Sequence, residues 1–486
     1  MNFRFLLPII ILIYGLSWVS CNRDVPASTD DRSVKAYGNK VLFDWNELFL
    51  RIDKDALGFR PAPGPRALAY INWATYEACI PGMPEYNSLR NHPSFVAANL
   101  PVFNTKNEIY WPEVVNEVQS YLMSRMFEKV AFFSASKGSF LTNADAQRLI
   151  NELKISNERD FQGKTNNVIF NNSKAWGEEI ARAVWEWSKT DVVAHESYLN
   201  PLNNDPSKSK YYDWRKFSLD ATGNRIPSKW TPTNDNPDGA MFPFAGEFRT
   251  FATTESQKIC KAPIRYSEDP SSLYYAQNLE VLNRSYTNVT YEDAWIGEFW
   301  SDDLFGLTFS PPSRLLACLD QIMILDNSKL DKAIYATALL SLSMNDFAVV
   351  CWNSKFHYNF ERPEHYIKDV LKVTNYESAL DHPYTGIEGI TPAFPAYPSG
   401  HSTFGGGGFF AIAAVYGDHF TFTDRCHQGR TEFVGTPRTY SNLSDAGFED
   451  AMSRIPLGVH VRQDCEEGLR LGKEIAARMV ALPWKK

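Results

Sequence analysis

Basic residues are not in excess in this chain of 486 residues, which carries 49 Lys and Arg against 57 Asp and Glu. The net charge of −8 argues against a general nucleic-acid binder, because a phosphate backbone requires a basic surface. Cysteine is also scarce, and none of the seven residues stands in a CxxC pair, which leaves a zinc or redox motif unsupported. The nucleotide-binding patterns GxGxxG and GxxxxGKS/T are absent too.

Charged residues make up only 22% of the chain, while 44% are hydrophobic and 14% are aromatic. This balance indicates a folded protein, rich in Trp, Tyr and Phe, rather than a disordered chain. A length of 486 residues exceeds one ordinary core, so the sequence predicts two domains or one large bundle.

The N-terminal segment has the features of an export signal. Arg4 precedes the apolar stretch Phe5 to Trp18, which suits a signal peptide and is too short to span a bilayer. Small residues then lead to Cys21, a pattern that resembles bacterial lipoprotein signals. We expect residues 1–20 to be removed and Cys21 to carry a lipid, which attaches the protein to a bacterial membrane in the periplasm or at the cell surface. A simple secretory peptide with Cys21 retained, or an uncleaved anchor, is the alternative.

Apolar residues recur every three or four positions in many segments, which is the period of an amphipathic helix. These segments are 66–79, 113–128, 143–157, 174–189, 312–324, 331–361, 401–416 and 461–482. Alternating strand patterns are few, so we predict an all-α protein built from helical bundles. Residues 190–330 are rich in Pro, Asn, Asp and Trp and predict loops and connectors. We divide the chain into an N-terminal helical region with an irregular aromatic-rich connector, 35–250, and a C-terminal helical domain, 251–486.

Three segments contain the candidate functional residues. The first, 331–361, contains neither Gly nor Pro and predicts a helix that ends at Arg362, before a proline. At 100° per residue, Trp352, Lys355, Asn359 and Arg362 fall on one stripe of that helix. An indole and two cations would then face the same place. Taken alone, a solvated basic face beside a core Trp explains the pattern equally well.

The second stretch runs from Phe394 to His401 and continues into a glycine run, 405–408. Ser399 is a natural N-cap for a helix that begins near Gly400, and a helix N-terminus exposes unpaired N–H groups that bind anions. His401 adds a group that titrates near neutral pH. The glycine run suits close helix packing better than phosphate binding. Taken alone, the stretch reads equally as a capped loop with a surface His.

The third stretch runs from Ser453 to Asp464. A proline and a glycine break the chain between Arg454 and His460, so His460 opens a new helix. Asp464 lies one turn later, where it could accept a hydrogen bond from the ring and orient it. Taken alone, this is a helix-breaking turn with an incidental His.

Together these stretches resemble the tripartite signature shared by vanadium-dependent haloperoxidases, type 2 phosphatidic acid phosphatases and bacterial acid phosphatases. Every position of that signature is filled, in the order Lys355-x6-Arg362-Pro363, Pro398-Ser399-Gly400-His401 and Ser453-Arg454-x5-His460-x3-Asp464. Chance agreement at all of these positions is improbable, so the separate structural explanations fail jointly.

The longer strings around these motifs look like those of the haloperoxidase branch. They are Trp352-x-x-Lys355, Phe394 to Gly406 and Ser453 to His460. Gly64 to Ala78 is similar to the N-terminal helix of bacterial members. Glu298 to Asp303 resembles a segment whose acid supports an active-site arginine, for which we choose Asp303 over Asp302. The resemblance implies two four-helix bundles, with the anion site in the C-terminal one.

The resemblance also implies a role for each site residue. Vanadate would be held through its equatorial oxygens by Lys355, Arg362 and Arg454, with hydrogen bonds from Ser399 Oγ and Gly400 N–H and with His460 as the axial ligand to the metal. His401 would be the acid–base, Asp464 would orient His460, and Asp303 would support an active-site arginine. Trp352 and Phe394 would form the halide pocket. Phosphate can occupy such a site in the apo form. A charged oxyanion of this kind needs several cations and oriented donors, which agrees with the set. The reaction implied is the oxidation of halide by hydrogen peroxide to hypohalous acid.

The same residues suit a phosphatase, in which His460 attacks the phosphorus of a phosphate ester to give a phosphohistidine and His401 protonates the leaving alcohol. The chain length, the aromatic pair Trp352 and Phe394 and the lack of multiple membrane spans favour the haloperoxidase. A third possibility is a surface lipoprotein that only binds phosphate or a polysaccharide. Such a protein has no need of both His401 and His460.

Overall fold

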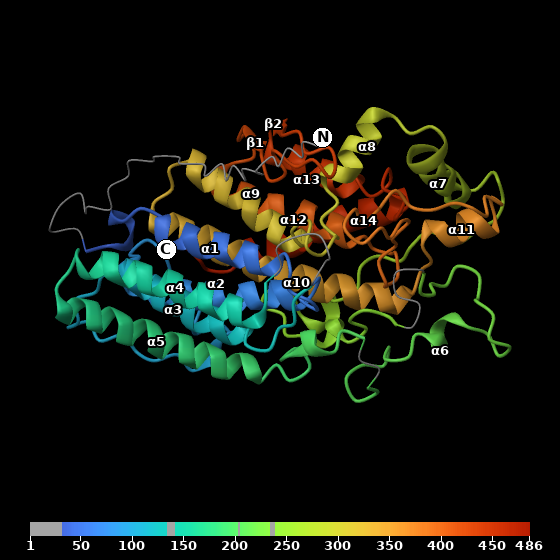
Figure 1. Cartoon of the computed structure of the whole chain (residues 1–486). Coiled ribbons are helices and arrows are strands. Elements are labelled where there is room, and N and C mark those ends of the chain that lie inside the picture. The colour runs from blue at the N-terminus through green and yellow to red at the C-terminus, as the bar shows by residue number, and fades with distance from the viewer. Residues whose placement is uncertain (1–31, 134–140, 203–204, 234–238) are drawn as a thin grey trace, which may run out of the picture.

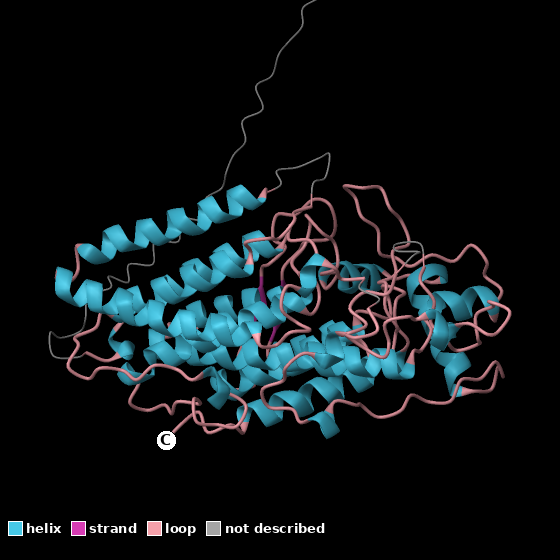
Figure 2. Ribbon diagram, turned by 90° about the horizontal axis from the view of Figure 1, so that it is seen from below, coloured by secondary structure: helices cyan, strands magenta, loops and turns pink. Residues whose placement is uncertain are grey.

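The computed structural model describes residues 32–133, 141–202, 205–233 and 239–486. The predicted signal peptide, residues 1–20, and the predicted lipidation site, Cys21, lie outside the described residues. Fourteen α-helices and one two-stranded sheet make up most of the regular structure of the described part (Figure 1, Figure 2). The all-α class predicted from the sequence is therefore confirmed.

The N-terminal half forms a helical bundle. Its members are α1 Lys40–Asp53, α2 Pro63–Cys79, α3 Trp111–Met126, α4 Asn143–Gln162 and α5 Asn167–Lys189. Helix α3 packs on α1, α2, α4 and α5, and Figure 1 shows these helices at one end of the molecule. Thr142 and Asn166 cap α4 and α5 by accepting hydrogen bonds from backbone N–H groups of the first turn. These caps explain why both helices begin where they do.

Helix α10, Leu330–Tyr358, connects the two halves of the molecule. It packs against α2 of the N-terminal bundle and against α12 and α14 of the C-terminal one. Among the described residues it is the one helix long and apolar enough to cross a membrane, and its apolar window is buried inside the protein. A helix that is apolar all round suits such a central position.

The C-terminal half surrounds a second apolar helix, α12, Gly400–Tyr416. Its neighbours are α9 Pro311–Leu325, α10, α13 Leu443–Met452 and α14 Arg462–Val480. Strands β1 Phe422–Asp424 and β2 Arg438–Tyr440 pair antiparallel, and β1 contacts α9. This small sheet is an addition to the helical architecture that the sequence patterns did not indicate.

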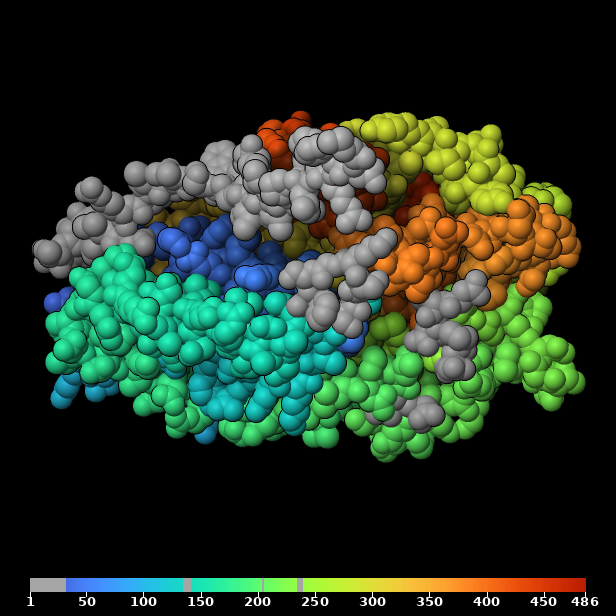
Figure 3. Space-filling model, viewed as in Figure 1, coloured from blue at the N-terminus to red at the C-terminus, as the bar shows by residue number. Residues whose placement is uncertain are grey.

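Residues 190–330 are largely irregular, as the sequence predicts, and carry the short helices α6 Arg215–Ser218, α7 Leu273–Leu282 and α8 Tyr291–Phe299. Figure 3 shows this green and yellow part of the chain at one end of the molecule, around the orange segment that contains α11, Pro363–Asp369. One continuous hydrophobic core extends from Val34 to Trp484. The boundary between 35–250 and 251–486 therefore stays a prediction.

The long helix α10 ends at Tyr358 rather than at Arg362. Asn359 follows in the left-handed conformation, with φ 50°, which Asn tolerates better than most residues. Its side-chain amide donates to Phe217 O and Ser218 Oγ, 3.1 and 2.8 Å away. Arg362 is the residue before α11, so the prediction that Asn359 and Arg362 share a face of one helix is wrong.

Glycines of both helices allow α12 and α14 to approach each other closely. Close packing is the use predicted for the run 405–408, and a Cβ on Gly407 would lie 2.7 Å from Gly472 O. A Cβ on Gly472 would lie 2.1 Å from Thr403 O, and a Cβ on Gly468 would lie 2.6 Å from Ser399 O. This contact places the first turn of α12 against the first turn of α14, where Ser399 N donates to Asp464 O at 2.9 Å. The glycines thereby bring two of the three signature segments together.

Gly472→Ala should destabilise the protein by about 1–3 kcal/mol or more, because the new methyl group would overlap the backbone of α12. Gly163→Ala is the matched control, since its Cβ would meet nothing nearer than Asp160 O at 3.4 Å. Urea unfolding of both variants measures the difference. Equal midpoints for Gly472→Ala and wild type would contradict the close contact.

Candidate active site

The residues of the three sequence motifs converge on one buried site, although they come from different elements. Lys355 lies near the end of α10, Arg362 precedes α11, and Ser399 precedes α12. The remaining three also lie at or near helix ends: His401 in the first turn of α12, Arg454 just after α13 and His460 just before α14. All six side chains are at least nine-tenths buried. The structure thus brings together every residue predicted to bind the anion.

Two cations of the site are held by backbone carbonyls rather than by carboxylates. Lys355 Nζ donates to Pro395 O and Ala396 O at 2.9 and 2.8 Å. Arg362 donates to carbonyl oxygens of the same inward-facing segment, those of Phe394 and Pro392, at 3.1 and 3.2 Å. Carbonyl groups orient these side chains without cancelling their charge, but burial, together with Arg362, lowers the pKa of Lys355 to about 7. A bound anion would stabilise the charged form of Lys355.

His460 presents one ring nitrogen to the cations and the other to an acid. Its Nδ1 lies 3.1 Å from Asp464 Oδ2, and its Nε2 lies 3.0 Å from Arg362 Nη1. Because a guanidinium only donates, Nε2 must be the acceptor and Nδ1 must carry the proton. Burial, together with Arg362 and Lys355, holds the pKa of His460 well below its usual range. The ring is therefore neutral, and its Nε2 lone pair is the one able to coordinate a metal or attack phosphorus.

Ser399 caps α12 from within the site. Its Oγ accepts from Ser402 N at 3.3 Å and lies 2.8 Å from the Ser402 hydroxyl. The first backbone N–H groups of α12, at Gly400 and His401, have no acceptor within the helix, as at any helix N-terminus. A hydroxyl and these N–H groups are the donors that an oxyanion requires at such a position.

Arg454 and His401 share one acid, Asp303. Arg454 Nη2 donates to Asp303 Oδ2 at 2.5 Å, and His401 Nε2 lies 3.8 Å from the same oxygen. Burial opposes the charge on Asp303, but His401 and Arg454 hold its pKa below the usual range. Burial and Arg454 lower the pKa of His401 to about 4, so this ring is neutral at pH 7. Asp303, chosen from the sequence over Asp302, is the acid that contacts Arg454.

Two residues of the site keep some exposure to solvent. The side chains of Asp303 and His401 are 18% and 8% exposed, whereas Lys355 and Arg362 are completely enclosed. A cavity of about 250 Å³ is lined by several residues that include Leu304, the residue after Asp303. His401 is therefore the more exposed of the two site histidines.

The aromatic pair predicted beside the anion site is in place. The rings of Trp352 and Phe394 meet edge to face, with centroids 4.8 Å apart. Lys355 Nζ and Arg362 Cζ each lie 5.1 Å from the centroid of Phe394, so two cations face one ring. The ring of Trp352 lies against Gly400, where a Cβ would come within 3.4 Å of it. A Cβ at position 400 would therefore be in van der Waals contact with this ring.

Several supporting groups carry no sequence signal that we recognised. Ser402 stands three residues after Ser399, and the Ser-x-x-Ser spacing at a helix start is the one clue that could have identified it. Arg60 supports the acid segment by donating to Asp302 O at 3.4 Å. It comes from the N-terminal half of the chain, and no local pattern predicts an interaction over that separation.

Comparisons with known proteins agree with this arrangement. Residues 335–483 match the family model described as the second helical-bundle domain of VCPO. The chain is 26% identical over 295 residues to vanadium chloroperoxidase from Curvularia inaequalis. That match covers 47% of this chain and 48% of the relative, so the chain spans about half the length of the curated relative that it matches.

The C-terminal part of the chain is therefore similar to the second helical-bundle domain of this family, and about half of the chain is similar to one vanadium chloroperoxidase. The fold of the chain also resembles solved structures. A bacterial vanadium-dependent iodoperoxidase superposes with a TM-score of 0.71 at 23% identity, over 91% of this chain and 95% of that one. A holo-type bacterial vanadium-dependent chloroperoxidase superposes with a TM-score of 0.58 at 14% identity, over 86% and 91%. At these identities the likeness establishes the shared helical fold.

Asp303→Asn should lower the pKa of His401 below about 4, because the carboxylate favours the charged imidazolium. His401 would then stay neutral to a more acidic pH than in the wild type. NMR titration of the His401 ring measures the change, with the exposed Asp269→Asn as control. A His401 pKa that stays the same or rises in Asp303→Asn would contradict the contact.

Proposed function

We propose that this protein is a vanadium-dependent haloperoxidase that oxidises halide with hydrogen peroxide to hypohalous acid. The observation that carries the proposal is the neutral His460, with its Nε2 directed at the cation Arg362 and its Nδ1–H on Asp464. A buried positive site that also offers an imidazole lone pair suits an oxyanion whose central atom accepts a nitrogen ligand.

The residues present fit vanadate. Three cations, Lys355, Arg362 and Arg454, would hold its oxygens, Ser399 and the N–H of Gly400 would donate to them, and His460 Nε2 would be the ligand to the metal. Arg454 Nε is buried and makes no hydrogen bond to the described residues, so it has a donor to spare. When bound, vanadate supplies a Lewis-acidic centre that polarises hydrogen peroxide for attack by halide.

His401 is suited to proton transfer at this site. It is neutral at pH 7, and its buried Nε2 has no hydrogen-bond partner among the described residues. An oxyanion bound beside Arg454 would offset the cation that lowers the pKa of His401, which raises that pKa toward the working range. Asp303, 3.8 Å away, would stabilise the charged ring.

Trp352 and Phe394 would form the apolar wall on which the halide approaches. Trp352 Nε1 donates to Met241 O at 3.3 Å, so the indole contributes its ring rather than its N–H. The two cations that face Phe394 would attract the halide to this wall. The wall keeps water from the site and leaves the halide weakly hydrated.

The protein loaded with orthovanadate should oxidise halide at the expense of hydrogen peroxide, and the vanadate-free protein should not. Iodide, bromide and chloride are assayed in parallel with hydrolysis of p-nitrophenyl phosphate. Inorganic phosphate added before vanadate should suppress the oxidation, because both anions compete for the same cations. Halide oxidation that is indifferent to vanadate, beside robust phosphate ester hydrolysis, would instead support a phosphatase with His460 as nucleophile.

Single variants separate binding from turnover. His460→Ala should lose vanadate binding, whereas Ser399→Ala should weaken it about 10- to 100-fold, as expected for one hydrogen bond to a charged group. His401→Ala should retain vanadate and lose about 10²- to 10⁴-fold in turnover, because it removes a proton donor and no ligand. Equilibrium dialysis measures the first effect and steady-state assays the second. Tight vanadate binding by His460→Ala would overturn the ligand assignment.

We also propose that the protein is exported by a bacterium and anchored to a membrane through a lipid on Cys21. The support is the sequence pattern from Arg4 to Cys21. Mass spectrometry of the protein expressed in a bacterial host should find a mature N-terminus at Cys21 that carries acyl chains, and Cys21→Ser should release the protein from the membrane fraction. An unmodified N-terminus in the soluble exported fraction would remove the proposal.

A further inference from the structure

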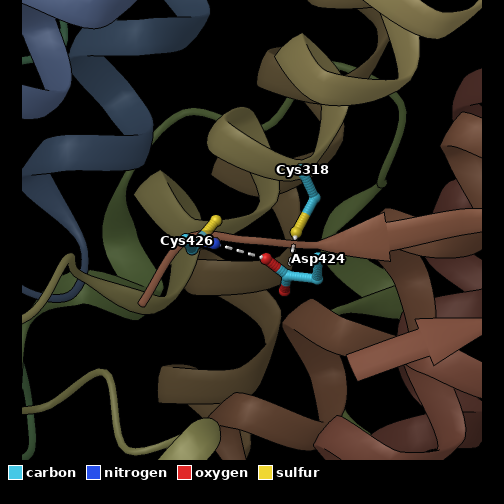
Figure 4. A group of neighbouring side chains, drawn as sticks. All are labelled: Cys318, Asp424 and Cys426. Atoms are coloured by element: carbon cyan, nitrogen blue, oxygen red, sulfur yellow. Dashed lines mark hydrogen bonds between the residues drawn. The ribbon is translucent and has the colours of Figure 1, made fainter. Parts of the chain in front are cut away.

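Two cysteines meet behind the site, at the contact between α9 and the turn after β1. Figure 4 shows Cys318 on α9, and Asp424 and Cys426 at the end of β1 and just beyond it. The two Sγ atoms and a carboxylate oxygen of Asp424 all lie within 4.8 Å of one another. Among the described residues this is the one such group that contains two cysteines. Cys318 and Asp424 are buried, and Cys426 is partly exposed.

The carboxylate of this group has no room for a metal. Asp424 Oδ2 accepts from Arg314 Nε and Nη2, at 3.1 and 2.8 Å, and from the Cys318 thiol at 3.5 Å. Its Oδ1 accepts from Cys426 N at 2.9 Å and from Gln321 Nε2 at 3.5 Å. These donors use the lone pairs that a cation would need, and Arg314 already balances the charge. The two sulfur atoms are the part of the group that is left to react.

We propose that Cys318 and Cys426 are an oxidisable pair that hydrogen peroxide converts into a disulfide bond between α9 and the turn after β1. The sulfur of the partly exposed Cys426 reacts first: it attacks one oxygen of the peroxide, the O–O bond breaks, one water leaves, and Cys426 becomes a sulfenic acid. The buried Cys318 thiol then attacks that sulfur, a second water leaves, and the S–S bond forms. Two electrons pass from the two sulfurs to the peroxide O–O bond, and the two thiol protons end in the two waters.

The surroundings favour a slow and selective reaction. Burial raises the pKa of both thiols, so the reactive thiolate is scarce at neutral pH. Gln321 Nε2 donates to Cys426 Sγ at 3.2 Å, which stabilises negative charge on the sulfur that meets peroxide first. The neighbouring thiol captures the sulfenic acid before further oxidation. Cross-linking should therefore speed up as the pH rises above 7.

The position of the pair connects it to the anion site. Arg314, which is held by Asp424, also contacts Asp302 Oδ1 at 3.5 Å, and the next residue, Asp303, holds Arg454. A disulfide beside Asp424 would fix the far end of this chain of contacts. In a protein exposed to hydrogen peroxide, the two thiols would thereby form a reversible disulfide bond instead of being oxidised further. The contacts from Asp424 through Arg314 to Asp302 would be kept.

The test treats the purified full-length protein with hydrogen peroxide, blocks the remaining thiols by alkylation, and examines digested peptides by mass spectrometry. We expect one cross-linked pair that contains Cys318 and Cys426, lighter by two hydrogens and restored by a reductant. The test needs no vanadate and no halide, so it does not depend on the proposed activity. Metal analysis of the untreated protein accompanies it, and one equivalent of bound zinc or copper released by a thiol reagent would overturn the proposal.

Three variants locate the reaction. Cys426→Ser should abolish the cross-link and leave Cys318 as a thiol, whereas Cys318→Ala should let Cys426 proceed to sulfinic acid. Cys79→Ala, which removes a buried thiol from α2, should form the cross-link as the wild type does. Either of the first two variants suffices if the other fails to fold. Wild-type protein in which peroxide takes Cys426 to sulfinic acid without any cross-link, or in which another cysteine pairs instead, would show that the inference is wrong.

Discussion

The structure depends on the burial of three cations, Lys355, Arg362 and Arg454, around one site. Buried charge is costly unless it is paired, and carbonyl oxygens orient Lys355 and Arg362 without neutralising them. The cost is visible at Lys355, whose pKa burial lowers to about 7. Arg454 is paired with Asp303. The remaining positive charge is what a bound oxyanion would neutralise. The rest of the fold holds these side chains where they repel one another.

Close helix packing keeps these side chains in place. The glycine contacts between α12 and α14 are too close for side chains, so the first turns of the two helices have little freedom to slide. Ser399 and Asp464 are joined directly by a backbone hydrogen bond across this contact. The same contact sets His460 beside the helix N-terminus that would bind the anion. The geometry of the anion site is therefore a consequence of the close approach of two helix backbones.

The two histidines are both buried and neutral, yet their environments give them different capacities. His460 has its proton fixed on Nδ1 by Asp464, which leaves Nε2 as a ligand. His401 stands beside the partly exposed Asp303, and its Nε2 has no partner among the described residues. His460 thus offers a ring nitrogen that can act as a ligand, whereas His401 offers a ring nitrogen that is free to take up or release a proton. Two neighbouring acids fix the surrounding cations: Asp303 pairs with Arg454, and Asp302 contacts Arg314.

The sequence by itself determined the helical class, the cap at Ser399 and the set of residues around the anion, because helix periods, caps and short motifs are local properties. It also indicated Asp464 as the partner of His460, since four residues make one helical turn. Only the tertiary structure decided how Arg362 reaches the site, because the left-handed Asn359 ends α10 early and no propensity required that break. The hydrogen bond from Arg60 to Asp302 O likewise depends on contacts between distant parts of the chain. Those contacts depend on how the two helical bundles pack, which no local pattern records.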